Sequence, residues 1–264
     1  MRTNLTHLLR YRALIQSLVA RDLKARYRGS VLGFFWSFVN PLLLLLVYTF
    51  VFTVVLPGFR GEGMEPFALF MFCGLLPWTW FSSSLLESAN VLIAGGNLIR
   101  KVLFPAEVLP IVSVLAGMAH FFLGLPILAA FFLYYQRPIV PADLLWLPVI
   151  VLVQLTLTLG LALIVSALTV HFRDLRDLLA NLLTLWFFAT PIIYPLSLVP
   201  DDVRPYLGLN PFTHLAVAYQ EVLFVQGPFT GGARLLLIGA ASLLVLAFGY
   251  FVFDRLRDTL AEEV

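Results

Sequence analysis

Six long stretches without a single charged residue divide this chain of 264 residues. Each is about 19 residues or longer, and a helix that rises 1.5 Å per residue needs about 20 apolar residues to cross a bilayer. The composition agrees, since 61% of the residues are hydrophobic and 12% are charged, against roughly 45–50% and 25% in soluble domains. The sequence therefore predicts an all-α integral membrane protein with six transmembrane helices. The stretches are Val31–Leu56, Pro66–Leu86, Val108–Gln136, Leu144–Phe172, Leu178–Pro200 and Leu235–Phe253.

The expected organisation is one transmembrane domain over residues 1–264, with two further elements beside the spans. Residues 4–28 carry Leu8, Tyr11, Leu14 and Leu18 at helical spacing among basic residues, a pattern that predicts an N-terminal amphipathic interface helix. Segment 199–233 mixes polar and apolar residues, so we expect a re-entrant outer hairpin that turns at Asn210-Pro211. The spans themselves are expected at 31–56, 66–92, 107–135, 144–170, 178–198 and 234–253.

The distribution of basic residues predicts the orientation. With six spans, both termini lie on the same side of the membrane. If that side is the cytoplasm, the inner segments hold 13 of the 17 Lys and Arg residues and the outer segments hold 4. The positive-inside rule therefore predicts that both termini are cytoplasmic.

The chain lacks the residues that an energy-coupling or catalytic site would need. A phosphate-binding loop requires a lysine after glycine and before Ser or Thr, and neither Lys24 nor Lys101 has that setting. Glu87, Glu107 and His120 are the candidates for a proton relay or an active site within the spans, and their spacing predicts no shared site. We expect no catalytic residue, no metal and no cofactor bound by this chain.

Two groups of residues are candidates for contact with a transported substrate. Aromatic residues reach 14%; aromatic belts at the membrane surfaces explain many of them, and the others could stack on sugar rings along a glycan channel. Arg26, Tyr27 and Arg28 are candidates for an inner gate that binds a lipid phosphate, although the positive-inside rule or attraction to ordinary anionic lipids explains the arginines equally well. The channel candidates are Phe35, Trp36, Trp78, Trp80 and Phe81.

Several stretches together resemble the permease subunits of type-2 ABC exporters of polysaccharides. They keep the family's order over nearly the whole chain, and the opening stretch is closer to the O-antigen and teichoic-acid permeases than to the capsule permeases. The stretches are Arg21–Gly33, Trp36-Ser37, Asn40-Pro41-Leu42, Asn97–Pro105, Phe172–Asp177, Thr190–Pro195 and Leu209-Asn210-Pro211.

The resemblance implies a homodimer in the bacterial cytoplasmic membrane that binds two copies of a separate ATPase subunit, which holds ATP and Mg. It implies export of lipid-linked O-antigen, teichoic acid or capsular polysaccharide. It also implies a coupling helix at Ile93–Leu103, an N-terminal interface helix that meets the ATPase, and an outer gate at Asn210, Pro211 and His214. The ATPase-coupling residues that it implies are Asn97, Arg100, Lys101, Arg173, Asp174, Arg176 and Asp177.

Two other functions stay open at this point. A membrane-embedded enzyme acting on lipid-linked sugars would need a carboxylate or histidine constellation at the membrane face. A passive channel would need polar faces along its spans, and the spans show little polar periodicity.

Overall fold

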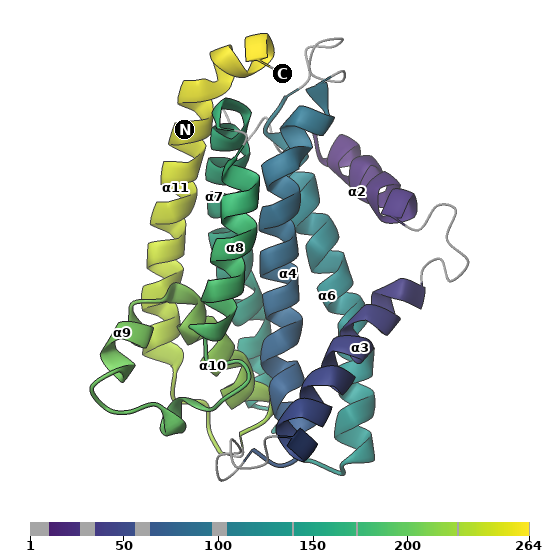
Figure 1. The fold of residues 1–264 in the computed structure, drawn as a ribbon, viewed down its shortest axis with the longest axis vertical. Helices are drawn as coiled ribbons and strands as arrows, with labels where there is room; N and C mark the ends of the chain where they lie inside the picture. The colour runs from purple at the N-terminus through teal and green to yellow at the C-terminus, as the bar shows by residue number, and fades with distance from the viewer. Residues whose placement is uncertain are drawn as a thin grey trace.

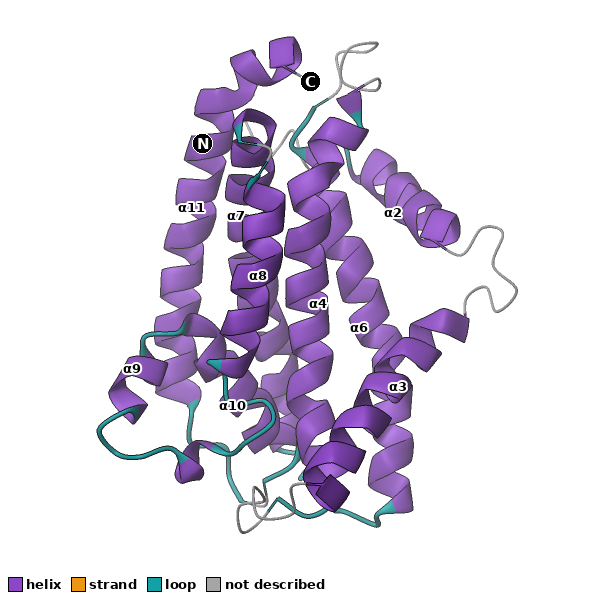
Figure 2. Ribbon diagram, viewed as in Figure 1, coloured by secondary structure: helices purple, strands orange, loops and turns teal. Residues whose placement is uncertain are grey.

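The computed structural model describes residues 11–26, 35–55, 64–96, 105–138, 140–172, 174–225 and 227–263. Within these ranges all regular structure is helical and no strand occurs (Figures 1 and 2). The all-α class is therefore confirmed for the described part of the chain.

Five helical segments in the described ranges are long and apolar enough to cross a membrane, and they correspond to five of the six predicted spans. The helices that supply them are α3 (Trp36–Phe50), which continues as the π-helical turn η2 (Val51–Val55), α4 (Phe67–Ala94), α6 (Val108–Tyr134), α7 (Leu147–His171) after the 3-10 turn η4 (Asp143–Trp146), and α11 (Gly232–Glu263).

The remaining predicted span, 178–198, differs in the structure. Helix α8 (Leu175–Phe188) has 14 residues, a length of about 21 Å at 1.5 Å per residue. The chain then turns, and the short 3-10 element η5 (Leu196–Leu198) follows. Pro191 and Pro195 explain the early end, because proline has no N–H for a helical hydrogen bond and disfavours helical backbone in the residue before it.

Helix α4 lies at the centre of the bundle and runs its full length (Figure 1). Of the residues in its most apolar stretch, 78% are buried, whereas only 6% are buried in that of α3. Helix α4 therefore forms the core and α3 lies at the periphery. Within the core, Gln154 of α7 donates a 2.9 Å hydrogen bond from Nε2 to the carbonyl oxygen of Pro77 in α4. This buried bond joins α7 to α4 at the proline inside that helix.

Helices α7 and α11 cross closely because glycine occurs on both. A Cβ atom at Gly160 would lie 2.7 Å from the backbone nitrogen of Leu246, and one at Gly249 would collide with the carbonyl oxygen of Gly160. Small residues at such a crossing let membrane helices pack backbone against backbone. The pair thus fixes α11, the last span, against the core.

Helix α2 (Arg12–Arg26) lies beside α6 near the upper end of the bundle in Figure 1. Leu18 is buried against Val108 and Val112 of α6, with Tyr11 and Ile15 packed around them. Of the apolar residues predicted for an interface helix, Tyr11, Leu14 and Leu18 therefore pack in this cluster with α6. Residues 4–10 and 27–28 of the predicted helix lie outside the described residues.

Candidate functional site

A hairpin of two short helices, α9 (Arg204–Gly208) and α10 (Pro211–Leu223), covers the lower end of the bundle in Figure 1. Asn210 stands at their junction and caps α10, since its Oδ1 accepts a hydrogen bond from the Phe212 N–H at 2.9 Å. Pro211 occupies the first turn of α10, where a missing N–H costs nothing. The predicted turn residues therefore begin α10.

Asn210 also joins the hairpin to the end of α8. The indole N–H of Trp186 donates to Asn210 Oδ1 at 2.7 Å, and Asn210 Nδ2 donates to Thr190 Oγ1 at 2.9 Å. Asn210 Nδ2 also donates to the Ala189 carbonyl oxygen at 3.4 Å, so this one side chain makes four hydrogen bonds that fix the start of α10. The sequence places Asn210 in the predicted outer gate but gives no sign of these partners.

A second polar contact holds the other end of α10. Gln220 Nε2 donates to the carbonyl oxygen of Pro191 at 2.9 Å in a buried position. Gly74 of α4 makes room for this contact, since a Cβ there would lie 3.1 Å from Gln220 Nε2. Helix α10 is consequently fixed against both the turn after α8 and the central helix.

Aromatic rings fill the space between α4, α8 and α10. Phe212 of α10 lies 5.0 Å from Trp78 and 4.7 Å from Phe81 of α4, measured between ring centroids. Trp186 of α8 lies 5.3 Å from Phe81. We call Trp78, Phe81, Trp186, Phe187 and Phe212 the aromatic cluster; it packs the hairpin onto the spans.

The aromatic channel candidates separate into two classes in the structure. Trp78, Trp80 and Phe81 are 5%, 2% and 0% exposed, and Trp80 donates its indole N–H to the Val114 carbonyl oxygen at 3.1 Å. These three rings serve packing in this conformation and leave no room for a sugar ring. Phe35 is 67% exposed, and Trp36, which begins α3, is partly exposed.

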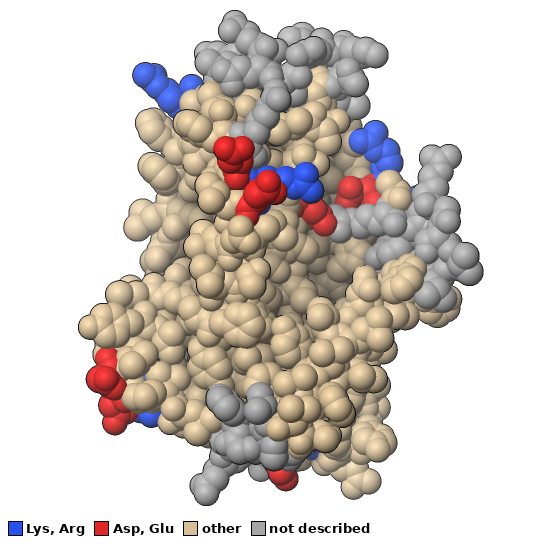
Figure 3. Space-filling view, in the orientation of Figure 1, with Lys and Arg blue, Asp and Glu red and all other residues tan. Residues whose placement is uncertain are grey.

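The opposite end of the bundle holds the described part of the predicted coupling set. Asp174, Arg176 and Asp177 are exposed where α7 ends and α8 begins, and Figure 3 shows charged side chains near this end of the molecule with an uncharged middle region on the same face. Asp177 lies in the first turn of α8, where the helix dipole favours a negative charge. Of the other predicted residues, Arg26 ends α2, and Tyr27, Arg28, Asn97, Arg100, Lys101 and Arg173 lie outside the described residues.

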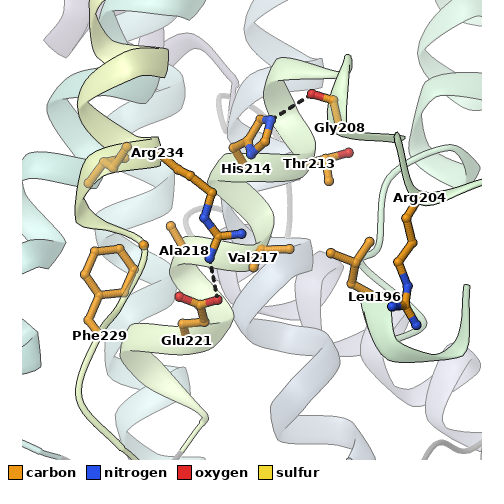
Figure 4. Close-up of a pocket in the computed structure, with 12 residues that line it drawn as sticks. Leu196, Arg204, Gly208, Thr213, His214, Val217, Ala218, Glu221, Phe229 and Arg234 are labelled. Atoms are coloured by element: carbon orange, nitrogen blue, oxygen red, sulfur yellow. Dashed lines mark hydrogen bonds and ion pairs between the residues drawn. The ribbon is translucent and has the colours of Figure 1, made fainter. Parts of the chain in front are cut away.

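A cavity of about 160 Å³ lies between the hairpin and the start of α11 (Figure 4). Glu221 of α10 forms an ion pair with Arg234 of α11 at 3.6 Å, and His214 Nε2 lies 2.8 Å from the carbonyl oxygen of Gly208. Burial raises the pKa of Glu221 above its ordinary value, and the charge of Arg234 partly offsets that rise. Sequence reasoning found His214 but missed Glu221, whose only local signal is a charge within an apolar helix.

Known proteins resemble this chain over most of its length. The sequence profile of the family described as ABC-2 type transporter matches residues 13–224. The O-antigen export system permease protein RfbA of Myxococcus xanthus is 43% identical over 260 residues, which is 97% of each chain. The protein of that name from Klebsiella pneumoniae is 33% identical over 253 residues, 94% of each chain. The polysialic acid transport protein KpsM of Escherichia coli is 23% identical over 249 residues, 92% of this chain and 93% of that protein.

Proposed function

The chain belongs to the ABC-2 type transporter family, and from that premise we propose that it moves a lipid-linked polysaccharide, O-antigen or a similar glycan, across the bacterial cytoplasmic membrane. It is a multi-pass permease, a transport protein without a catalytic domain. A separate ATPase subunit, which binds ATP and Mg, supplies the energy. The likeness to the two RfbA proteins supports O-antigen as the glycan class.

The observation that carries this proposal is the hairpin α9–α10 across one end of the bundle. An exporter must open its outer end for the glycan and close it afterwards. The hairpin is joined to α8 and its following turn by hydrogen bonds of Asn210 and Gln220 and to α11 by the Glu221–Arg234 ion pair. The hydrogen bonds contribute about 1 kcal/mol each and the partly exposed ion pair contributes less. Contacts of this strength suit a gate, with Asn210, Pro211 and His214 at its hinge.

The other end of the bundle faces the cytoplasm and docks the ATPase in this proposal. The exposed charges of Asp174, Arg176 and Asp177 support it, because they lie where α8 begins. Both termini are then cytoplasmic. The coupling surface also includes Asn97, Arg100, Lys101 and Arg173, and Arg26, Tyr27 and Arg28 bind the lipid phosphate at the inner gate.

The working unit is a homodimer with two ATPase subunits. Only 6% of the residues in the spanning stretch of α3 are buried. This exposure supports a second copy packed beside α3, in a symmetric interface where each copy presents the same surface. The glycan channel then runs between the copies past Phe35 and Trp36. The buried Trp78, Trp80 and Phe81 support the gate from within each subunit.

The test is affinity purification of the tagged chain from its host in mild detergent. We expect a stoichiometric ATPase subunit whose ATP hydrolysis changes when this chain is added. Reversal of an exposed charge at the docking end, Asp177→Lys, should weaken that association, whereas Asp202→Lys, exposed at the opposite end, is the matched control and should not. Recovery of intact complexes that never contain an ATPase would contradict the proposal.

A further inference from the structure

An apolar groove lies between α3 and α6, toward the lower end of the bundle in Figure 1, where α6 ends. Its volume is about 640 Å³, within the roughly 300–1,000 Å³ of small-molecule sites. Because both helices belong to membrane spans, the groove lies at the depth of lipid acyl chains. It is lined by Leu42 of α3 and by Pro126, Ile127, Ala130, Phe131 and Tyr134 of α6.

A polar pocket of about 420 Å³ adjoins the groove at the end of α6. Tyr134 lines the groove and Tyr135 lines the pocket, and the centroids of their rings are 5.0 Å apart. Phe131, which also lines the groove, stacks on Tyr135 with 6.2 Å between the ring centroids. The groove and the pocket are therefore the apolar and polar parts of one site. The pocket is lined by Thr49, Thr53, Glu65, Tyr135 and residues 66–68 at the start of α4.

One face of α3 contributes to both parts of the site. Leu42 lines the groove and Thr49 lines the pocket, and residues seven apart lie on the same face of a helix, about two turns from each other. Leu43 and Val47 lie on a different face and are exposed, so they stay available to the second copy proposed above. A molecule in the groove therefore does not compete with the proposed dimer.

The polar pocket presents hydrogen-bond acceptors that a ligand can reach. Glu65 is exposed, Thr53 is partly buried and Tyr135 is 39% exposed. Thr53 Oγ1 donates its proton to the Thr49 carbonyl oxygen at 2.6 Å, so it can only accept a hydrogen bond from a ligand. A carboxylate accepts up to about four hydrogen bonds, so Glu65 can bind a ligand in addition to its contacts within the protein. A carboxylate beside an accepting hydroxyl suits a positively charged donor, such as a primary ammonium group.

We propose that the groove and the pocket together bind one membrane phospholipid with an ethanolamine headgroup. One acyl chain lies in the groove beside Ala130 and Phe131. The headgroup ammonium donates to the Glu65 carboxylate and the Thr53 hydroxyl oxygen, and the Tyr135 hydroxyl faces the phosphate and ester oxygens. The bound lipid fills the space between α6 and α3, a helix that the rest of the chain packs sparsely. This proposal requires only that the chain spans a membrane, and it does not depend on the identity of the glycan.

The test is native mass spectrometry of the full-length chain, purified in mild detergent with any subunit that accompanies it and then stripped of lipid. Phosphatidylethanolamine, phosphatidylcholine and phosphatidylglycerol with the same acyl chains are added separately. We expect one phosphatidylethanolamine per copy to bind more tightly than phosphatidylcholine, whose ammonium has no N–H, and than phosphatidylglycerol, whose headgroup has no positive charge. Glu65→Gln should reduce this preference about 2- to 5-fold, as for an exposed ion pair. The matched control is Asp202→Asn, an exposed carboxylate at the same end of the bundle, which should leave the preference unchanged.

Two adjacent alanines of α6 test the acyl-chain part of the site. Ala129 and Ala130 are both exposed, but of the two only Ala130 lines the groove. Ala130→Trp places an indole where the acyl chain would lie and should weaken phosphatidylethanolamine binding about 5-fold or more, because the chain and the ring cannot share the space. Ala129→Trp adds the same side chain outside the groove and should bind the lipid as the wild type does. The melting temperature of each variant shows whether its fold is intact.

Binding that Ala130→Trp weakens and Ala129→Trp does not, together with a headgroup preference that Glu65→Gln reduces, would support the site. Equal binding by the two tryptophan variants at unchanged melting temperature would overturn it. A wild-type chain that binds the three lipids equally, or that prefers phosphatidylglycerol, would overturn it as well, and this comparison decides the question if Ala130→Trp does not fold. Glycan export in vesicles is measured separately, so a failure of the lipid site leaves the permease function standing.

Discussion

Replacement of Asn210 by alanine should free the start of α10 from the end of α8. The change removes a helix cap, which is worth about 1 kcal/mol, and the bonds to Trp186 and Thr190, worth about 1 kcal/mol each. It also removes the 3.4 Å bond to the Ala189 carbonyl oxygen, which is long and adds little. The free energy required to open the hairpin should then fall by about 3 kcal/mol, which corresponds to a roughly 150-fold larger population of the open form.

Hydrogen–deuterium exchange of the α10 amides in detergent measures this opening directly. Two matched variants separate the contributions: Asn210→Ser keeps a cap but is too short to reach α8, and Asn210→Asp keeps both bonds that Oδ1 accepts. Exchange of the α10 amides should accelerate least in Asn210→Asp, more in Asn210→Ser and most in Asn210→Ala, while the amides of α7 exchange as in the wild type. Equal α10 exchange in wild type and Asn210→Ala would refute the assignment of Asn210 as the hairpin's anchor.

Three further changes test the packing around the site. Gly249→Ala should lower the free energy of unfolding by about 1–3 kcal/mol, because the added methyl collides with the α7 backbone. Gly208→Ala adds a methyl with nothing within 4 Å and should change that free energy by less than about 0.5 kcal/mol. Thermal unfolding in detergent compares the two variants. Trp78→Ala should cost about 3–5 kcal/mol and reduce the yield of folded protein, whereas Phe35→Ala, at a 67% exposed ring, should not, and equal yields would contradict the packing role of the cluster. Burial raises the pKa of Glu221 above 4.5 although Arg234 opposes the rise. The contribution of Glu221 to stability is therefore fully present below pH 4.5 and is lost as the pH rises through the folded-state pKa, so the melting temperature should decline over that pH range. Glu221→Gln should remove this contribution to the decline, and an unchanged decline in the variant would contradict the pKa shift.

The long spans could be predicted because the signal for them is local. Charged residues bound each apolar run, so the predicted 66–92 and 107–135 differ from α4 and α6 by two residues at most. The end of α8 could not be predicted in the same way. Pro41, Pro77 and Pro126 lie inside helices, whereas the chain turns at Pro191. Whether a helix continues through a proline or ends before it depends on neighbouring helices, and the sequence does not specify these.

The site shows the same division between local and tertiary signals. Asn210-Pro211 could be recognised as the turn of the hairpin because an Asn-Pro dipeptide favours a turn in the sequence itself. The burial of Trp78 could not, because it depends on Trp186 and Phe212, which come from α8 and α10 far along the chain. The Glu221–Arg234 pair likewise forms only after α10 packs beside α11.

The central claim, ATP-driven export of lipid-linked glycan through this chain, is tested most directly by transport in vesicles. The chain and its ATPase subunit are reconstituted together, lipid-linked glycan is supplied on the ATPase side, and a glycosidase on the other side reports arrival. The account predicts cleavage that requires ATP and that is lost when the ATPase carries a replaced phosphate-binding lysine. ATP hydrolysis without any ATP-dependent cleavage, or cleavage at the same rate without ATP, would contradict it.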